Sequence, residues 1–354
     1  MSTPRQLPPG FDRLKSGKIR WRIQLDGKRI TGTADTYTEA QRDRSLAAIT
    51  GGGEAPPAAP TVAEIVAHYF DHYAGSPVSR QADERAASHL PDVFAHRIAA
   101  DVRPAHIGAL WAQLLAAGVY PSACDRLAGV MSKAWRAAAA FGWVDRNPWR
   151  DVDAPSGPQA TEVRPPTPDD VRAIIAACRT APMALIVRLA AVTGARRGEL
   201  CAIQWGDLRL DVGELVIRRS LAEADRQLHV GDTKTGRKGH RTIPLDPGTI
   251  RLIRAHRRVV GCDWVFTHDG ATPWRPPYVT LEYQRTRARV GVPSSFHGLR
   301  HYAATQWLAA GTPPSQVAGF LGHSTVATVL RTYSHFIPAQ GRDTITAHAA
   351  TLDG

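Results

Sequence analysis

Cysteine is scarce in this sequence, and Cys124, Cys178, Cys201 and Cys262 stand too far apart to form a CxxC pair or a Cys/His ligand set. The sequence therefore predicts neither a zinc site nor a disulfide framework, and a reducing cytoplasm is the expected location. An apolar run of about 18 residues is also lacking, and residues 1–10 contain no apolar stretch. We therefore expect neither a membrane span nor a secretion signal.

Acidic residues are the second shortage. Asp and Glu together number 32 against 44 Lys and Arg, which gives a formal net charge of +12. Such a surplus of positive charge favours a polyanionic partner such as a nucleic acid. Composition reports a tendency to associate and not a chemistry, so a basic protein without a nucleic-acid role stays open on this ground alone.

The first module, residues 9–50, carries the pattern of a small sheet followed by a helix. Apolar and polar side chains alternate over residues 19–25, which is the period of a strand with one buried face. Turn signals flank that strand on both sides, and a further strand is expected at 28–33. Thr36 and Glu39 then form a capping box ahead of a helix.

The exposed face of this predicted sheet is basic. A three-stranded ribbon with cations on its outer face resembles the strand-based elements that lie in a DNA groove. The alternative is a solvated sheet face without a ligand. The candidate DNA-binding residues are Lys18, Arg20, Arg22, Lys28 and Arg29.

A module made only of helices is predicted for residues 61–146. Thr61 and Glu64 repeat the capping-box signal, and apolar residues follow at helical spacing. Further helical segments are expected at 81–95, 104–117 and 121–140. Linkers are expected on both sides of the module. Residues 51–60 hold too few large apolar side chains to pack, and residues 147–165 are rich in proline.

The third module, residues 166–345, mixes helices with short strands and is followed by a tail, 346–354. It opens with a capped helix start at Thr167, and a nearly apolar and therefore buried helix is expected at 184–192. Strand signals follow at 215–217, 228–230 and 242–245. The predicted fold class is thus a multidomain α+β protein: a small sheet plus helix, a helical module, and a mostly α module with a small antiparallel sheet.

Two segments of the third module suit the binding of a phosphate. In Thr193–Leu200 (TGARRGEL) the glycines let backbone pass close to a ligand, and Glu199 is placed to orient an arginine. In residues 232–236 (DTKTG) Lys234 lies beside a predicted hairpin turn, as a donor to phosphate or a source of a proton. Taken alone, an Arg–Glu pair is usually structural and a turn lysine is usually solvated.

Two further segments add imidazoles, a guanidinium and a phenol. In residues 296–301 (FHGLRH), His297 and Arg300 are three positions apart and so share a helix face. His323 follows at a turn (LGHS), and Tyr333 lies ten residues beyond it. A histidine at a turn is commonly a satisfied polar residue, and a lone tyrosine more often belongs to a core, so these residues gain meaning only as a set.

In this order the segments resemble the tyrosine recombinase (phage integrase) family, whose pattern is Arg, Lys, His-x-x-Arg, His or Trp, then Tyr. The resemblance covers roughly residues 165–340, and the separated elements agree in type, spacing and order. Ala195 is a small departure, because a larger apolar residue is common there. We expect this difference to affect packing and not chemistry.

The resemblance implies a catalytic set and no metal or cofactor. Arg197 is the less favoured first arginine, because it falls one place late in the TGxRxGE pattern. Glu199 would be the supporting carboxylate. The implied catalytic residues are Arg196, Lys234, His297, Arg300, His323 and Tyr333.

The implied reaction is attack of Tyr333 on a DNA phosphate, which leaves a 3′-phosphotyrosine and a free 5′-hydroxyl. Arg196 and Arg300 would neutralise the phosphate oxygens, with His323 and His297 as further donors. His297 is the candidate for taking the phenolic proton, and Lys234 for giving one to the departing 5′-oxygen. Because the protein–DNA bond retains the phosphoester energy, rejoining needs neither ATP nor a metal.

The resemblance also implies domain roles and partners. The helical module resembles a core-binding domain, and residues 9–50 resemble the arm-binding domain of integrases that also grip accessory DNA sites. The implied partners are double-stranded DNA at core and arm sites, a homo-tetramer on two duplexes, a DNA-bending host factor and a directionality factor. By analogy, the tail from Ala339 onward packs on a neighbouring protomer. The implied role is integration or excision of a phage or other mobile element, in the cytoplasm and at the nucleoid when bound to DNA.

Three alternatives are weighed against this interpretation. A type IB topoisomerase uses similar chemistry, but the arm-like first module argues against it. A DNA-binding regulator that lost its chemistry is disfavoured by the intact residue set. A metal-dependent nuclease is disfavoured because the sequence holds no clustered Asp/Glu/His set.

Overall fold

The computed structural model describes most of the chain. The described residues are 7–25, 28–50, 59–157, 165–234, 236–256 and 258–336. The chain divides into two compact units, Met1–Thr161 and Glu162–Gly354. Most of the first predicted linker, part of the second, and the tail with its predicted packing on a neighbour lie outside the described residues.

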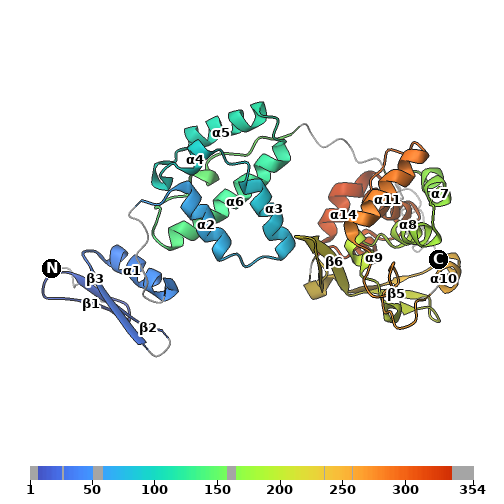
Figure 1. Ribbon diagram of the computed structural model, residues 1–354, viewed down its shortest axis with the longest axis horizontal. Coiled ribbons are helices and arrows are strands. Elements are labelled where there is room, and N and C mark those ends of the chain that lie inside the picture. The colour runs from blue at the N-terminus through green and yellow to red at the C-terminus, as the bar shows by residue number, and fades with distance from the viewer. Residues whose placement is uncertain are drawn as a thin grey trace, which may run out of the picture. The chain divides into compact units, whose positions relative to one another are not determined.

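The N-terminal module is a three-stranded antiparallel sheet with one helix, as predicted (Figure 1). Its strands, in spatial order, are β1 (Phe11–Arg13), β2 (Ile19–Leu25) and β3 (Lys28–Ala34), followed by helix α1 (Tyr37–Thr50). The apolar face of β2 is buried, with Ile19 2 % and Trp21 6 % exposed, because α1 packs over it. The Thr36–Glu39 capping box is confirmed by hydrogen bonds in both directions.

Helices alone build the second module, as predicted. They are α2 (Val62–Asp71), α3 (Pro77–Ala87), α4 (Asp92–Ala95), α5 (Pro104–Ala116) and α6 (Pro121–Ala140), with short 3-10 turns η1 (Ala99–Asp101) and η2 (Pro148–Arg150). The Thr61–Glu64 capping box is confirmed. The single helix expected at 81–95 is wrong. Pro91 cannot continue a helical ladder, so α3 ends before it and α4 begins after it.

The second unit is a helical body with short antiparallel strands. Its helices are α7 (Pro168–Ala176), α8 (Ala181–Thr193), α9 (Arg197–Cys201), α10 (Pro247–Ala255), α11 (Pro276–Arg289), α12 (Gly298–Ala309), α13 (Pro314–Leu321) and α14 (Val326–Tyr333). Its 3-10 turns are η3 (Trp205–Asp207), η4 (Gly236–Gly239) and η5 (Ser334–Phe336). The predicted buried helix is α8, whose apolar residues sit in the main core of the unit.

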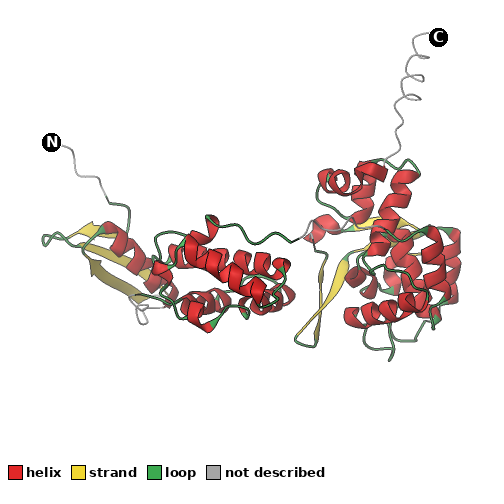
Figure 2. Ribbon diagram, turned by 90° about the horizontal axis from the view of Figure 1, so that it is seen from above, coloured by secondary structure: helices red, strands yellow, loops and turns green. Residues whose placement is uncertain are grey.

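Two small sheets hold the strands of this unit. The strands are β4 (Leu208–Arg209), β5 (Glu214–Ile217), β6 (Arg219–Ala224), β7 (Gln227–Asp232) and β8 (Arg241–Pro244), in the orders β4-β5-β8 and β6-β7. Strands β4 and β6 are absent from the sequence prediction; β6 (RSLAEA) has none of the β-branched residues that mark a strand. Figure 2 shows the β6–β7 ribbon extending from the helices.

A separate apolar cluster joins the last three helices. It combines Ala304 and Leu308 of α12, Val317, Ala318 and Leu321 of α13, and Val329 and Tyr333 of α14. Helix α12 also packs on α8, so this cluster connects the C-terminal helices to the main core. Within the part of the chain that the structure describes, no helix combines the length and apolar character needed to span a membrane. The predicted α+β fold class is confirmed.

Candidate active site

The first arginine segment begins where α8 ends. Gly194 closes that helix in the left-handed conformation, with φ of 60°, which glycine adopts without strain. Arg196 follows as the N-cap of α9, and its backbone N–H and its guanidinium donate to Glu199 at 2.8 and 2.9 Å. The predicted Arg–Glu contact is therefore present and belongs to a helix cap.

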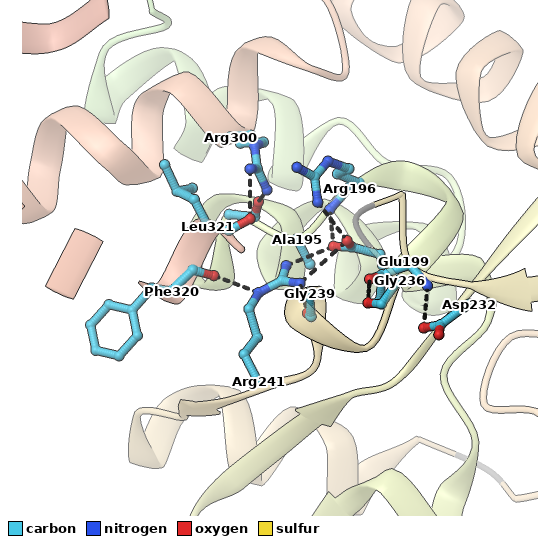
Figure 3. A network of polar contacts seen from close by, with 12 residues as sticks. Ala195, Arg196, Glu199, Asp232, Gly236, Gly239, Arg241, Arg300, Phe320 and Leu321 are labelled. Atoms are coloured by element: carbon cyan, nitrogen blue, oxygen red, sulfur yellow. Dashed lines mark hydrogen bonds and ion pairs between the residues drawn. The ribbon is translucent and has the colours of Figure 1, made fainter. Parts of the chain in front are cut away.

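Glu199 is shared between two arginines (Figure 3). Its side chain is 0 % exposed, and Arg241, at the start of β8, donates to its two oxygens at 2.7 and 3.3 Å. Arg241 also donates to the carbonyls of Phe320 at 2.6 Å and Gly239 at 3.1 Å. Burial alone would raise the pKa of Glu199, but the hydrogen bonds and charges of Arg241 and Arg196 outweigh it and leave that pKa below its usual value.

Arg300 is held by backbone carbonyls and not by a carboxylate. It is 3 % exposed, and its guanidinium donates to the carbonyls of Gly194 and Leu321, each at 2.7 Å (Figure 3). These carbonyls lie at the C-terminal ends of α8 and α13, where helices present partial negative charge. Burial, followed by the charge of Arg196, lowers the pKa of Arg300 to about 9, so it remains protonated at neutral pH.

The glycines of this segment have a different role from the predicted one. A Cβ on Gly194 would lie 2.9 Å from Leu321, and a Cβ on Gly198 would lie 2.4 Å from the carbonyl oxygen of Leu221. Both glycines therefore make room for neighbouring protein atoms. We expected these glycines to let the backbone pass close to a ligand. Instead, strand β6 passes directly over α9 and occupies the space beside Gly198.

Lys234 follows β7 in the connection to β8. It is exposed, and the loop around it is fixed by the Thr233 hydroxyl, which donates to the carbonyl of Gly236 at 2.6 Å. Asp232, at the end of β7, has a His240 ring nitrogen at 2.7 Å. Strand β7 pairs with β6 and β8 pairs with β5, so the predicted hairpin from Lys234 into the next strand is wrong.

His323 lies one residue after the left-handed C-cap of α13, Gly322, whose φ is 65°. Its backbone N–H donates to the carbonyl of Ala318 at 2.9 Å, which fixes the turn. Its ring nitrogen Nδ1 is buried and has no hydrogen-bond partner among the described residues. An unsatisfied buried nitrogen costs free energy that a bound ligand can recover.

Tyr333, the last residue of α14, has His301 as its partner. Its hydroxyl lies 2.7 Å from Nδ1 of His301, and Tyr333 is 4 % exposed. Burial raises the pKa of Tyr333, and the nearby charge of Arg300 opposes that rise. His297, the predicted proton acceptor, instead lies ring against ring with His301, with 5.0 Å between ring centroids.

All three imidazoles of the site are harder to protonate than a free histidine. Burial, then neighbouring charges that include Arg300, lower the pKa values of His297 and His323 to about 4. Burial and Arg300 also lower the pKa of His301. The imidazoles are therefore neutral at pH 7 in the absence of an anion.

A cavity of about 540 Å³ connects the two arginine segments. The charged or titratable residues that line it are Arg196, Arg197, Lys234, His297 and Arg300. No Asp or Glu is among the residues that line it. The cavity is thus a ready site for an anion.

Four of the six predicted catalytic residues line this cavity: Arg196, Lys234, His297 and Arg300. Tyr333 and His323 do not line it, but both are close enough to Arg300 to be influenced by its charge. The charge of Arg300 acts on both of their pKa values. Arg197 also lines the cavity, but it is exposed and its guanidinium contacts the Thr280 hydroxyl, whereas Arg196 has the carboxylate.

Arg241 and His301 are the residues that sequence reasoning missed. His301 is four positions after His297, the spacing of one helix face, which is the signal that would have drawn attention to it. Arg241 offered no local signal, because its partner Glu199 is 42 positions away in the sequence.

Three of the candidate DNA-binding residues of the N-terminal sheet pair with carboxylates. Lys18 pairs with Asp35 at 3.1 Å, Arg20 pairs with Asp12 at 3.1 Å, and Arg22 also contacts Asp12. Arg29 is exposed, and nothing is described of the Lys28 side chain. The predicted basic face is therefore partly neutralised. No group of at least three His, Cys, Asp or Glu suited to a metal occurs in the described residues.

Comparison with known proteins identifies the second unit. The phage integrase family model matches residues 166–339. A tyrosine recombinase XerC-like protein of Caldanaerobacter subterraneus subsp. tengcongensis is 26 % identical over 232 residues, which are 56 % of this chain and 58 % of that protein. The chain thus spans a little over half the length of that relative.

Solved structures extend the likeness in fold to most of the chain. The Tn1549 transposon integrase in complex with transposon right end DNA has a TM-score of 0.67 at 16 % identity, over 83 % of this chain and 100 % of that one. A lambda integrase tetramer bound to a Holliday junction has a TM-score of 0.61 at 20 % identity, over 91 % of this chain and 97 % of that one. Residues 166–339 of this chain therefore form a domain of the phage integrase family.

Proposed function

We propose that this chain is a site-specific recombinase that cleaves and rejoins double-stranded DNA through a 3′-phosphotyrosine at Tyr333. Its biological role is to integrate or excise a phage or other mobile element. The observation that carries the proposal is the cavity lined by Arg196, Lys234, His297 and Arg300 without a carboxylate, beside a buried tyrosine under the charge of Arg300. A DNA phosphate is the anion that this family offers to such a cavity.

The arginines supply most of the catalytic effect. Arg196 and Arg300 are fixed before substrate arrives, by Glu199 and by helix C-terminal carbonyls, so little reorganisation is needed when charge grows on the phosphate. Loss of one preorganised donor of this kind typically costs about two to three powers of ten in rate. Both arginines therefore act on the rate more than on the affinity for DNA.

The protonation of His297 and His323 is proposed to depend on whether a phosphate is bound. Without an anion, burial and then positive neighbours keep the pKa values of His297 and His323 at about 4. A bound phosphate adds negative charge next to them and favours their protonated forms. His323, whose Nδ1 lacks a partner among the described residues, then donates to a non-bridging oxygen.

Lys234 is the proposed acid for the departing 5′-oxygen. It lines the cavity from a loop, and three cationic residues share that cavity with it. Its ammonium group carries the proton that such an acid must supply. The departing 5′-oxygen takes that proton, and the reverse transfer accompanies rejoining.

Tyr333 must be uncovered before it attacks. It is 4 % exposed and is not among the residues that line the cavity. The helix that carries it packs on the C-terminal apolar cluster and not on the main core. DNA binding is proposed to bring the phosphate and the hydroxyl together while the contact between Tyr333 and His301 is maintained.

The partners follow from this function. Double-stranded DNA binds at a core site and at an arm site, the latter through Lys18, Arg20, Arg22, Lys28 and Arg29 of the N-terminal sheet. Strand exchange needs two duplexes and therefore a homo-tetramer, which is the assembly of the lambda integrase bound to a Holliday junction. A DNA-bending host factor and a directionality factor complete the proposed set.

The direct test is the Tyr333→Phe variant on a nicked suicide substrate, in which the cleaved 5′ fragment diffuses away. We expect DNA affinity close to the wild-type value and no covalent protein–DNA adduct, because phenylalanine keeps the packing and removes the nucleophile. Denaturing gel electrophoresis of labelled DNA measures the adduct, and a mobility-shift assay measures affinity. An adduct formed by this variant at the wild-type rate would exclude Tyr333 as the nucleophile.

A further inference from the structure

The hydrogen bond between Tyr333 and His301 has no place in the catalytic set that the family resemblance implies. The hydroxyl of Tyr333 lies 2.7 Å from Nδ1 of His301, and among the described residues this ring is its hydrogen-bond partner. Both residues lie where α12 and α14 meet beside the C-terminal apolar cluster. The contact therefore joins the proposed nucleophile to the helix that carries Arg300.

His301 is in the state needed to accept a proton. Burial and the charge of Arg300 lower its pKa, so at neutral pH the ring is uncharged and one nitrogen is free to accept. Burial raises the pKa of Tyr333, which keeps the phenol protonated at rest. In the tautomer that carries its hydrogen on Nε2, Nδ1 accepts a hydrogen bond from the phenolic O–H.

The groups around His301 support this assignment. Arg300 precedes it on α12, His297 faces it edge to face, and Tyr333 approaches from α14. No carboxylate pairs with His301 in the described residues. His297 lines the cavity, whereas His301 does not, so the ring of His301 is the one placed against the phenol.

We propose that His301, and not His297, orients the phenol of Tyr333 and takes its proton during cleavage. This inference rests on the proposed function. The Tyr333 oxygen forms a bond to phosphorus while the bond from phosphorus to the 5′-oxygen breaks. The phenolic proton passes to Nδ1 of His301, and the 5′-oxygen is protonated by a separate acid.

The timing of the proton transfer follows from acidity. At rest the phenol holds its proton more strongly than an imidazolium at His301 would, so no phenolate accumulates. As the oxygen bonds to phosphorus it loses its basicity, and transfer to the imidazole becomes favourable. Rejoining runs the same transfer backwards, with imidazolium His301 returning the proton to the departing phenol.

The test compares His301→Leu with His301→Asn in the full-length protein. The leucine keeps bulk without an acceptor, while the asparagine Oδ1 lies close to the position of Nδ1 and accepts a hydrogen bond without holding a proton. We expect cleavage of a suicide substrate to slow by about a hundredfold or more in the leucine variant. The asparagine variant should cleave about tenfold faster than the leucine variant, because it restores the alignment only.

Controls separate this inference from the proposed function. Tyr302→Phe, one position along α12, should cleave at the wild-type rate, and mobility shift should show unchanged DNA affinity for every variant. The inference is overturned if His301→Leu cleaves at the wild-type rate or faster, because the contact would then only hold Tyr333 in its resting position. Equal losses in the leucine and asparagine variants would also overturn it. If wild-type protein forms no adduct at all, the proposed function fails instead.

Discussion

The N-terminal sheet and the catalytic cavity hold their arginines in opposite ways. In the sheet, Arg20 and Arg22 meet Asp12 at a surface where the three side chains are 44 %, 32 % and 37 % exposed. In the cavity, Arg300 is buried and bonded to backbone carbonyls, and Arg196 shares one buried carboxylate with Arg241. Residue type alone therefore says little about the role of an arginine.

The difference predicts different functions for the two sets. An exposed ion pair contributes about 0–1 kcal/mol, so a DNA phosphate replaces the carboxylate of Asp12 at little cost. The cavity arginines have fixed positions and no carboxylate along the cavity wall, so they suit a transition state. The sheet should therefore govern affinity and its salt dependence, and the cavity should govern rate.

The largest expected effect comes from Arg300→Lys. A lysine keeps the charge, but it cannot bond both Gly194 and Leu321 and still direct planar donors at a phosphate. We expect the rate of adduct formation to fall by about two to three powers of ten with little change in DNA affinity. Single-turnover cleavage and mobility shift measure the two quantities. A matched loss of both would make Arg300 a binding contact and would abolish the contrast with the sheet.

The next effect concerns Arg241, which we propose as a positioning residue for Glu199 and hence for Arg196. Replacing Arg241 with methionine removes one partner of a buried ion pair, and we expect a loss of stability of about 3 kcal/mol, the low end for such pairs. Arg196 still bonds to the carboxylate and limits the loss. Urea unfolding measures it. The surface variant Arg20→Met is the matched control and should lose about 1 kcal/mol at most.

The stability loss caused by Arg241→Met should depend on pH, and the direction of that dependence tests the ion-pair explanation. The pKa of Glu199 is below its usual value in the folded protein, so its ion pairs stabilise above the unfolded pKa of about 4.3 and are lost as pH falls through the folded value. The stability difference between wild type and variant should therefore shrink as the pH drops from 7 toward 3. A difference that grows at acid pH would contradict the ion-pair explanation.

The smallest effect is expected in the sheet. Arg22→Ala should weaken DNA binding about three- to tenfold across arm sequences, and should lower the slope of log affinity against log salt by about 1. Cleavage of pre-bound core DNA should not change. The matched variant Asp12→Asn should have the opposite effect on DNA affinity. It removes the carboxylate that pairs with Arg20 and Arg22, so DNA should bind more tightly. Fluorescence anisotropy across salt concentrations checks both variants.

Local features of this chain were predictable and long-range ones were not. The capping boxes at Thr36 and Thr61 follow from residues three positions apart, and the period of β2 identifies its buried face. The contact of Glu199 with Arg241 spans 42 positions, and that of Tyr333 with His301 spans 32. Such contacts depend on how α9, β8, α12 and α14 pack, which residue spacing does not encode.

The catalytic set itself came from resemblance and not from physical reasoning about isolated residues. A turn lysine such as Lys234, or a tyrosine such as Tyr333, has a commoner structural explanation when taken alone. The structure distinguishes Arg196, which is bonded to Glu199, from the exposed Arg197, and it places His301 beside the phenol.

The most direct measurement of the central claim is peptide mapping of the covalent adduct. Wild-type protein is trapped on a suicide substrate, digested with protease and nuclease, and analysed by mass spectrometry for the peptide that carries a 3′-nucleotide. We predict a single modified residue, Tyr333. Modification of any other residue, or efficient cleavage of the DNA without a covalent peptide, would contradict the account.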